Sequence, residues 1–274
     1  MEKTYYLNGA FLPASEAKIH VGDIAIGRGY GVFDYFQVRE GVPLFRSEHL
    51  DRFMRSCKLL NIALDESRAF LEQAIDKLIY IDHIDKAGIK LIATGGVSPD
   101  GFSPGKASTA ILVLPYYEPP QQMVDNGVKL LSFEYQRLLP HIKSTNYLYN
   151  VYLSPQLKAA GAIEPLYYTS ESVRETARAN IFAVINGVLV TSGEKVLSGI
   201  NREKTLQLGY PVELRNITLE EMKNADEVFL TGTTKRAIGV TRIDDAIIGD
   251  GKPGTITMDI RKKLLAKEAS LLVS

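Results

Sequence analysis

The chain has 274 residues, 45% hydrophobic and 23% charged, which is the balance of an ordinary soluble protein of one or two domains. Its 32 basic and 32 acidic residues cancel, so the charge favours neither nucleic acid nor an acidic membrane surface as a partner. The single cysteine, Cys57, excludes an intrachain disulfide and fits a reducing compartment. No apolar run has the length of a signal peptide or a membrane helix, so we expect a cytoplasmic protein without a membrane partner.

The N-terminal half predicts a mixture of strands and helices. Asn8-Gly9 lies between aromatic and apolar residues and predicts a hairpin turn. A glycine-rich segment, 27–31, precedes a strand over 32–38, and Ser47 can cap a helix with one apolar face. Further elements are expected as a helix over 67–81 and strands over 89–94 and 110–114.

A proline-rich segment, 115–122, is the best candidate for a linker. Pro119 and Pro120 are adjacent, and such a pair cannot continue a helix or a central strand. We therefore predict an N-terminal α+β domain over 1–117, a linker over 118–125 and a C-terminal domain over 126–274.

The C-terminal half again mixes hairpins with helices. A second Asn-Gly turn, Asn186-Gly187, joins two of the expected strands. This mixture predicts an α+β fold rather than a regular alternation of parallel strands and helices. The expected strands are 128–133, 165–169, 181–185, 188–190 and 227–230, and the expected helices are about 147–160, 202–208 and 258–269.

Two stretches carry the most specific chemistry. The first is Leu-Pro-His-Ile-Lys-Ser-Thr-Asn-Tyr-Leu around Lys143, and the second is Val-Arg-Glu-Thr-Ala-Arg-Ala-Asn-Ile-Phe around Glu175. Most lysines and glutamates are solvated, so neither residue carries an assignment alone. Together the stretches resemble those of fold-type IV (class IV) pyridoxal-phosphate aminotransferases, a family with branched-chain aminotransferases, D-amino-acid aminotransferases and aminodeoxychorismate lyases.

The resemblance implies a role for each matching residue. Lys143 would bond covalently to pyridoxal 5'-phosphate in a buried site and later act as a general base, while Glu175 would face the pyridine nitrogen. Arg52, in His-Leu-Asp-Arg, would bind the phosphate with forked donors. Tyr147 would contact the phenolic oxygen and Leu197 the ring face, and the remaining phosphate donors would be Gly199, Ile200, Asn201, Thr233 and Thr234.

The resemblance also implies a two-domain fold and a homodimer. The N-terminal domain would be an α/β sandwich and the C-terminal, cofactor-binding domain an α/β barrel-like unit. The substrates would be an amino acid and a 2-oxo acid such as 2-oxoglutarate, and each has a carboxylate that forked arginine donors can hold. Arg28, Arg178 or both are candidates for that role, beside Phe33 in the substrate pocket.

The chain matches no subfamily in full. Its segment 95–102 lacks the Arg-x-His pair of better-known D-amino-acid aminotransferases, and Phe33 replaces their pocket tyrosine. Branched-chain enzymes usually show Tyr-Gly where this chain has Arg28-Gly29. The Lys-Ser-Thr-Asn spacing favours the D-amino-acid and lyase branch, so we hypothesise a D-amino-acid transaminase. An L-branched-chain transaminase and a 4-amino-4-deoxychorismate lyase stay open as alternatives.

A different class, a cofactor-free binding protein on the same fold, is disfavoured because the lysine, glutamate and arginine are all present. A metal enzyme is disfavoured because the four histidines lack the short ligand spacings of zinc sites.

Overall fold

The computed structural model describes residues 2–273, which divide into two compact units. Unit 1 contains the described chain up to Tyr117, the short segment Ile142–Asn146 and the described residues from Leu271 onward. Unit 2 contains Glu118–His141 and Tyr147–Ser270. The chain therefore passes from one unit to the other several times.

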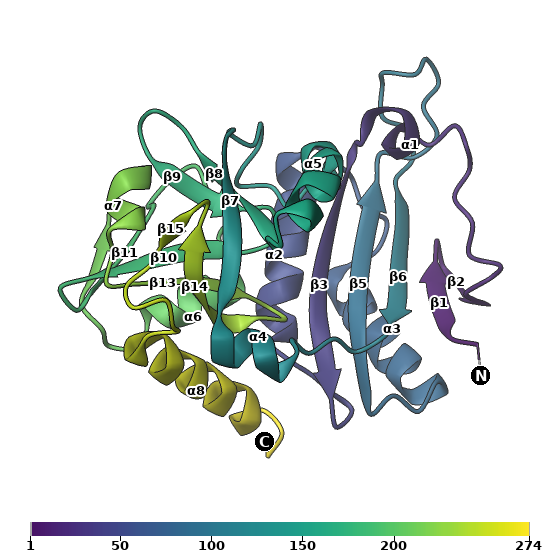
Figure 1. Cartoon of the computed structure of the whole chain (residues 1–274). Helices are drawn as coiled ribbons and strands as arrows, with labels where there is room; N and C mark the ends of the chain where they lie inside the picture. The colour runs from purple at the N-terminus through teal and green to yellow at the C-terminus, as the bar shows by residue number, and fades with distance from the viewer. Residues whose placement is uncertain (1, 274) are drawn as a thin grey trace. The chain divides into compact units, whose positions relative to one another are not determined.

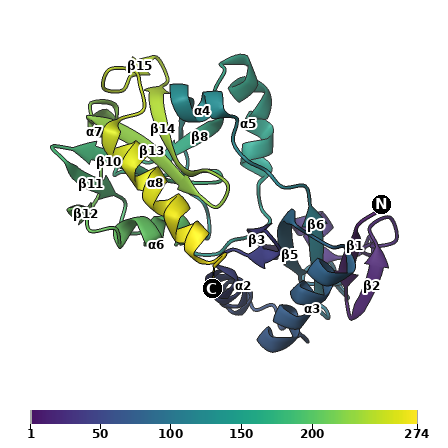
Figure 2. The same cartoon turned by 90° about the horizontal axis from the view of Figure 1, so that it is seen from below.

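Unit 1 is built on an antiparallel sheet with the strand order β2-β1-β6-β5-β3-β4 (Figure 1). The helices α2 and α3 lie on the same face of this sheet (Figure 2). The strands are β1 (Thr4–Leu7), β2 (Ala10–Pro13), β3 (Gly31–Arg39), β4 (Val42–Pro43), β5 (Lys86–Thr94) and β6 (Ser108–Leu114), and the helices are α1 (Ile24–Arg28), α2 (Arg46–Leu59) and α3 (Arg68–Ile81).

Alternation along the central strands makes the core of unit 1. Val32, Phe36 and Val38 of β3 are buried beneath Leu50 and Phe53 of α2. Phe33 and Tyr35 lie on the opposite face, because successive side chains of a strand point to opposite sides. One face of the sheet is therefore sealed by helices, and Phe33 belongs to the other.

Unit 2 contains a mixed sheet with the strand order β12-β11-β10-β13-β14-β7-β8-β9, with β15 paired to β14. The pairs β11/β12, β14/β7 and β7/β8 are parallel. The strands are β7 (Val128–Glu134), β8 (Glu164–Tyr168), β9 (Val173–Thr176), β10 (Asn180–Ile185), β11 (Val188–Thr191), β12 (Val212–Leu214), β13 (Glu227–Gly232), β14 (Arg236–Ile243) and β15 (Ala246–Ile247). The helices are α4 (Gln121–Asn126), α5 (Leu148–Ala159), α6 (Ile200–Leu206), α7 (Leu219–Lys223) and α8 (Thr255–Ser270).

The C-terminal helix α8 covers one face of this sheet (Figure 2). Phe182 of β10 and Phe229 of β13 stack with ring centroids 5.0 Å apart. Ile260 and Leu264 of α8 belong to the same buried cluster. These contacts fix α8 over the strands that end near the candidate phosphate-binding residues.

The α+β fold predicted from the sequence is confirmed, and three local predictions need correction. The expected linker over 118–125 contains most of α4, which begins after Pro120. A proline is tolerated there because the backbone N–H that it lacks has no hydrogen-bond partner within a helix at this position. Ser47 does not cap α2. The cap is Phe45, two residues earlier, and the helix begins at Arg46. The Ser47 hydroxyl instead accepts a hydrogen bond from Arg68 (2.7 Å).

The third correction concerns the predicted C-terminal domain over 126–274. Residues Ile142–Asn146 lie within that range but pack with unit 1. Val32 and Ser144 form an isolated antiparallel bridge, and the Phe33 amide donates to the Lys143 carbonyl (2.9 Å). Strand pairing with β3 therefore places the Lys143 segment in unit 1.

Candidate functional site

Lys143 is held by its backbone on both sides. Its carbonyl accepts from Phe33 in β3, and its amide donates to the Ser56 hydroxyl of α2 (3.3 Å). The Lys143 side chain is half-buried, whereas the sequence analysis expected a buried one. Its amine lies 4.6 Å from the centroid of the Phe33 ring. An aromatic face attracts an ammonium, so this contact helps to position the amine.

Arg52 lies in a buried ion-pair cluster of unit 1. Its guanidinium donates from Nε to Asp34 Oδ2 and from Nη2 to Asp34 Oδ1, each at 2.8 Å. His49 Nδ1 lies 2.7 Å from Asp34 Oδ1. This two-bond pairing fixes the plane of the guanidinium, which is what directional recognition of a phosphate requires.

The charges of this cluster are set by mutual compensation. Burial alone would raise the pKa of the Asp34 carboxyl, but Arg52 and His49 outweigh burial and hold that pKa far below its usual range. Burial lowers the pKa of His49, and the positive charges of Arg52 and Lys143 lower it further against the opposing effect of Asp34. Asp34 is therefore ionised and His49 neutral at pH 7.

Arg28 is the last residue of α1, followed by Gly29 in the left-handed region (φ 65°). Its side chain is exposed, and its guanidinium lies 4.7 Å from the centroid of the Phe102 ring. Arg28 is thus carried by unit 1 at the surface, stacked on an aromatic side chain.

Glu175 is the central group of unit 2. Its buried carboxylate accepts through Oε2 from the Leu197 amide (3.0 Å) and from Asn180 Nδ2 (3.4 Å). The same Asn180 amide nitrogen donates to the Leu197 carbonyl (2.8 Å). Two of the predicted residues, Glu175 and Leu197, are therefore brought together, and Asn180 holds both.

Arg137 is a functional candidate that the sequence analysis missed. Its Nη1 lies 3.9 Å from Glu175 Oε1, and its guanidinium lies 5.4 Å from the centroid of the Tyr147 ring. Burial alone would lower the pKa of Arg137, but Glu175 and Tyr147 outweigh it and raise that pKa. Burial raises the pKa of Tyr147 against the opposing effect of Arg137. A buried carboxylate and a partly buried guanidinium and phenol thus form one cluster.

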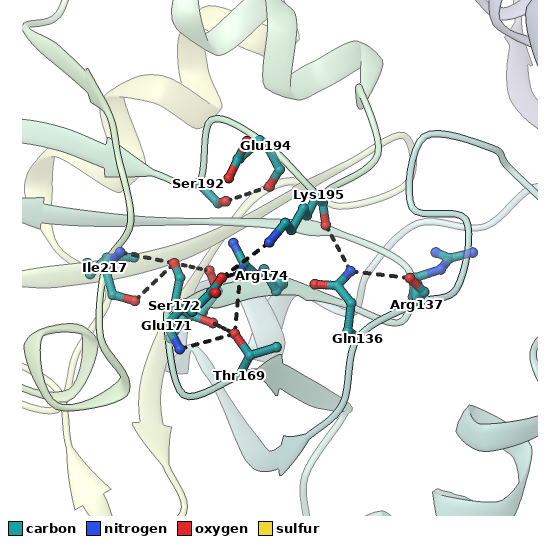
Figure 3. A network of polar contacts seen from close by, with 11 residues as sticks. Gln136, Arg137, Thr169, Glu171, Ser172, Arg174, Ser192, Glu194, Lys195 and Ile217 are labelled. Atoms are coloured by element: carbon teal, nitrogen blue, oxygen red, sulfur yellow. Dashed lines mark hydrogen bonds and ion pairs between the residues drawn. The ribbon is translucent and has the colours of Figure 1, made fainter.

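A polar network supports the segments on which Arg137 and Glu175 lie (Figure 3). Gln136 donates from Nε2 to the carbonyls of Arg137 and Lys195, each at 3.3 Å. Arg174, beside Glu175 in β9, donates from Nη2 to Thr169 Oγ1 (3.3 Å) and Glu171 Oε2 (2.9 Å) (Figure 3). Neighbouring residues of a strand point to opposite faces, so Arg174 anchors β9 from the side away from Glu175.

The predicted phosphate donors lie at two connected turns of unit 2. Gly199 is the N-cap of α6, and a Cβ at this position would lie 2.1 Å from Asn180 Oδ1. Asn201 donates from Nδ2 to the Gly232 carbonyl (2.8 Å), which ties the start of α6 to the turn between β13 and β14. The Asn201 side chain therefore holds that turn, and only its backbone amide remains as a candidate donor to a phosphate.

The turn between β13 and β14 carries Thr233 and Thr234, both half-buried. Arg236 follows in the left-handed region (φ 55°), which is unfavourable for a side chain other than glycine or asparagine. Arg236 is fully buried and pairs with Glu268 of α8 at 2.9 Å, and its Nη1 donates to the Thr234 carbonyl (3.1 Å). An ion pair to α8 thus fixes the turn that presents both threonines.

Arg178 does not join the group around Glu175. Its side chain is 59% exposed, and its Nε lies 3.3 Å from Oε1 of the buried Glu164. Its backbone amide donates to Oε2 of the same residue (2.9 Å).

Within residues 2–273, none of the helices combines the length and apolar character needed to cross a membrane. The same part of the chain contains no group of three or more His, Cys, Asp or Glu side chains arranged to hold a metal ion.

Known proteins resemble this chain over most of its length. Residues 31–243 match the family described as amino-transferase class IV. A D-alanine aminotransferase from Bacillus licheniformis is 32% identical and covers 94% of each chain. A putative branched-chain-amino-acid aminotransferase from Methanocaldococcus jannaschii is 30% identical, again over 94% of each chain.

Solved structures agree with these sequence matches. A branched-chain amino acid aminotransferase from T.th. with pyridoxamine 5'-phosphate has a TM-score of 0.90 at 26% identity, covering 98% of this chain and 95% of that one. With the lysine, glutamate and arginine in the expected order on this fold, the matches show that the chain belongs to the class IV aminotransferase family.

Proposed function

We propose that this class IV aminotransferase uses pyridoxal 5'-phosphate to move an amino group from a D-amino acid to a 2-oxo acid such as 2-oxoglutarate. The observation that carries the proposal is the buried Glu175 carboxylate, held by Leu197 and Asn180 and flanked by Arg137 and Tyr147. Such a carboxylate suits a protonated pyridine nitrogen, and the Lys143 amine suits an aldehyde.

The residues of the chain fit this cofactor. Glu175 stays in place as an acceptor because two donors fix its Oε2 oxygen. Gly199 has no side chain at the start of α6, and this lets Asn180 Oδ1 occupy the place that a Cβ would take and keeps Asn180 beside Glu175. We propose that Arg52, the backbone amides of Ile200 and Asn201, and Thr233 and Thr234 hold the phosphate, and that Tyr147 holds the phenolic oxygen.

Each residue then has a separate task in the transfer. The bound cofactor supplies an electron-withdrawing ring that stabilises negative charge at the substrate Cα. The Lys143 amine, positioned on Phe33, would act as the base that removes the proton from the substrate Cα. Glu175 would hold the pyridine nitrogen in its protonated form, and Leu197 would exclude water from the ring face.

The preference for D-amino acids rests on two observations. The Lys-Ser-Thr-Asn order favours the D-amino-acid branch, and a D-alanine aminotransferase is among the relatives above 30% identity. The branched-chain relative from Methanocaldococcus jannaschii favours L-branched-chain transamination as the second candidate.

The visible spectrum of the purified protein tests the cofactor assignment. We expect a yellow protein whose absorbance band is lost in Lys143→Ala, because the aldehyde then has no amine to bond. Lys58→Ala, an exposed lysine on α2, is the matched control and should keep the band. A wild-type protein that stays colourless after addition of pyridoxal 5'-phosphate would refute the proposal.

The handedness is tested with D-alanine, D-glutamate and L-leucine, each with 2-oxoglutarate, and with 4-amino-4-deoxychorismate alone. We expect turnover of the D-amino acids. Turnover of L-leucine only would establish the branched-chain activity, and pyruvate release from 4-amino-4-deoxychorismate alone would establish the lyase.

Arg28 and Arg178 remain the proposed carboxylate-binding arginines. Each is exposed in its own unit, and a surface guanidinium can turn toward an anion. Arg28→Ala and Arg178→Ala should raise KM for amino acids and leave the cofactor band unchanged. An unchanged KM in both variants would exclude this role.

We further propose that the protein is a homodimer. The helix α5 exposes Leu148, Val151 and Tyr152 by 78%, 66% and 76%, and their spacing places them on one side of the helix. An apolar stripe of this kind marks an interaction surface. Light scattering should give twice the chain mass, and Val151→Glu should give the mass of one chain.

The free, buried Cys57 also supports a cytoplasmic location.

A further inference from the structure

Lys90 is a half-buried cation that the sequence analysis did not single out. It lies in β5, where it pairs across the sheet with Tyr35, while Phe33 pairs with Ile92. Cross-strand partners share a face of a sheet, so Lys90 lies on the same face as Phe33, opposite the face that α2 and α3 cover.

The Lys90 amine meets the same aromatic ring as the reactive lysine. Lys90 Nζ lies 5.0 Å from the centroid of the Phe33 ring, and Lys143 Nζ lies 4.6 Å from it. The two amines are therefore grouped around one side chain, although they come from segments more than fifty residues apart.

The Lys90 amine has no hydrogen-bond or ion-pair partner among residues 2–273. Burial lowers its pKa, and no carboxylate of the described chain offsets that effect. An anion beside a half-buried ammonium of this kind stabilises it, because the attraction between the two charges compensates for the solvation that burial removes.

We propose that Lys90 pairs with the substrate carboxylate when an amino acid or 2-oxo acid reacts at Lys143. The inference deepens the proposed function, on which it rests, by naming a specificity residue in unit 1. The substrate class has a carboxylate bonded to Cα, so its anion lies one bond from the carbon that Lys143 would deprotonate. Lys90 differs from the exposed Arg28 and Arg178 because it is half-buried beside Phe33, so its charge would add to the carboxylate binding proposed for those arginines.

The test compares Lys90→Met, which keeps the length of the side chain and removes its charge, with Lys90→Arg, which restores the charge. Lys86→Met is the matched control, because Lys86 is an exposed lysine of the same strand. Three quantities are measured on the cofactor-loaded protein. They are KM and kcat for the amino acid, the Kd of 4-methylvaleric acid followed by cofactor absorbance, and the reaction rate of 2-aminobutane, a primary amine without a carboxylate.

We expect Lys90→Met to raise both KM and the Kd of 4-methylvaleric acid by about tenfold or more, as loss of a charge-assisted contact predicts. The rate with 2-aminobutane and the cofactor band should stay unchanged. Lys90→Arg should recover most of the affinity, and Lys86→Met should behave like the wild type. A purely structural role of Lys90 would instead weaken the acid and the amine equally.

Two results would overturn the inference while leaving the proposed function intact. One is a Lys90→Met protein whose KM and Kd stay within about twofold of the wild type. The other is a variant that loses the cofactor band, which would place Lys90 in cofactor binding or folding. If Lys90→Met does not fold, Lys90→Gln is measured in the same way. A wild-type protein without a cofactor band would refute the proposed function itself.

Discussion

Buried charges in unit 1 make the stability of this protein depend on pH. The folded-state pKa of His49 lies below its unfolded value of about 6.5, because burial and nearby cations oppose protonation. Above that pH, His49 is neutral in both the folded and the unfolded chain, so its titration does not change the free energy of unfolding. As the pH falls below it, the unfolded chain takes up the proton first, so stability is lost by at most about 1.4 kcal/mol per pH unit.

We therefore predict that His49→Gln lessens the fall in unfolding free energy between pH 7.5 and pH 5.5 by about 1 kcal/mol. Glutamine keeps a donor for Asp34 and does not titrate in this range. Urea unfolding followed by circular dichroism measures the effect, and His141→Gln, at an exposed position, should keep the wild-type slope. An unchanged slope in His49→Gln would contradict the prediction.

Motifs locate charged residues better than they identify the partners of those residues. Arg52 and Glu175 were found because their flanking residues match a family, but Arg137 was missed because an isolated arginine has no periodic pattern. The position of Asp34 in the sequence indicates a buried ion pair, and the sequence analysis did not use it. Asp34 occupies an inward position of β3 between Val32 and Phe36, and a carboxylate at such a position needs a buried cation.

At the scale of elements, α8 fixes the turn that presents Thr233 and Thr234. We predict that Glu268→Gln costs about 3 kcal/mol of stability, because the fully buried Arg236 then keeps only the more distant and exposed Glu118 (3.8 Å) as a counter-charge. Asp259→Asn on the same helix breaks an exposed pair with Lys263 and should cost less than about 1 kcal/mol. Urea unfolding compares the two variants, and equal costs would show that the Arg236 pair is not the anchor.

Element types were predicted better than element limits. The helix over 67–81 is confirmed as Arg68–Ile81 with Ser67 as its cap, because side-chain capping and an apolar stripe are local signals. The start of α2 was wrong because Phe45, in the left-handed region, ends the preceding turn without a polar cap. Gly199 was a weak signal in the sequence, and the need for glycine at this N-cap of α6 arises from contact with Asn180 of β10.

At the scale of the whole molecule, Cys57 reports on unit 1 alone. Burial raises the pKa of its thiol to about 12, so the reactive thiolate is scarce in the folded protein. We predict that a thiol reagent at pH 8 labels no cysteine in the native protein and one per chain in urea. Labelling midpoints below the circular-dichroism midpoint would show that unit 1 opens first, and rapid labelling without urea would contradict the buried thiol.

The division into two units was less predictable than the fold class. A proline pair drew attention to the region near residue 118, but no local pattern places 142–146 with the N-terminal sheet. That assignment depends on pairing between Phe33 and Lys143, residues 110 positions apart, and such contacts are absent from periodicity.

This excursion of the chain has a consequence for dissecting the protein. A chain break after Tyr117 would place Lys143 on a fragment that lacks β3, the strand with which its segment pairs. Neither fragment would then be active alone. Mixing the two fragments would restore the surroundings of the Lys143 amine only when the segment 142–146 of the second fragment pairs with β3 of the first. In a protein expressed as two fragments divided at this point, activity would thus depend on pairing between the Lys143 segment and β3.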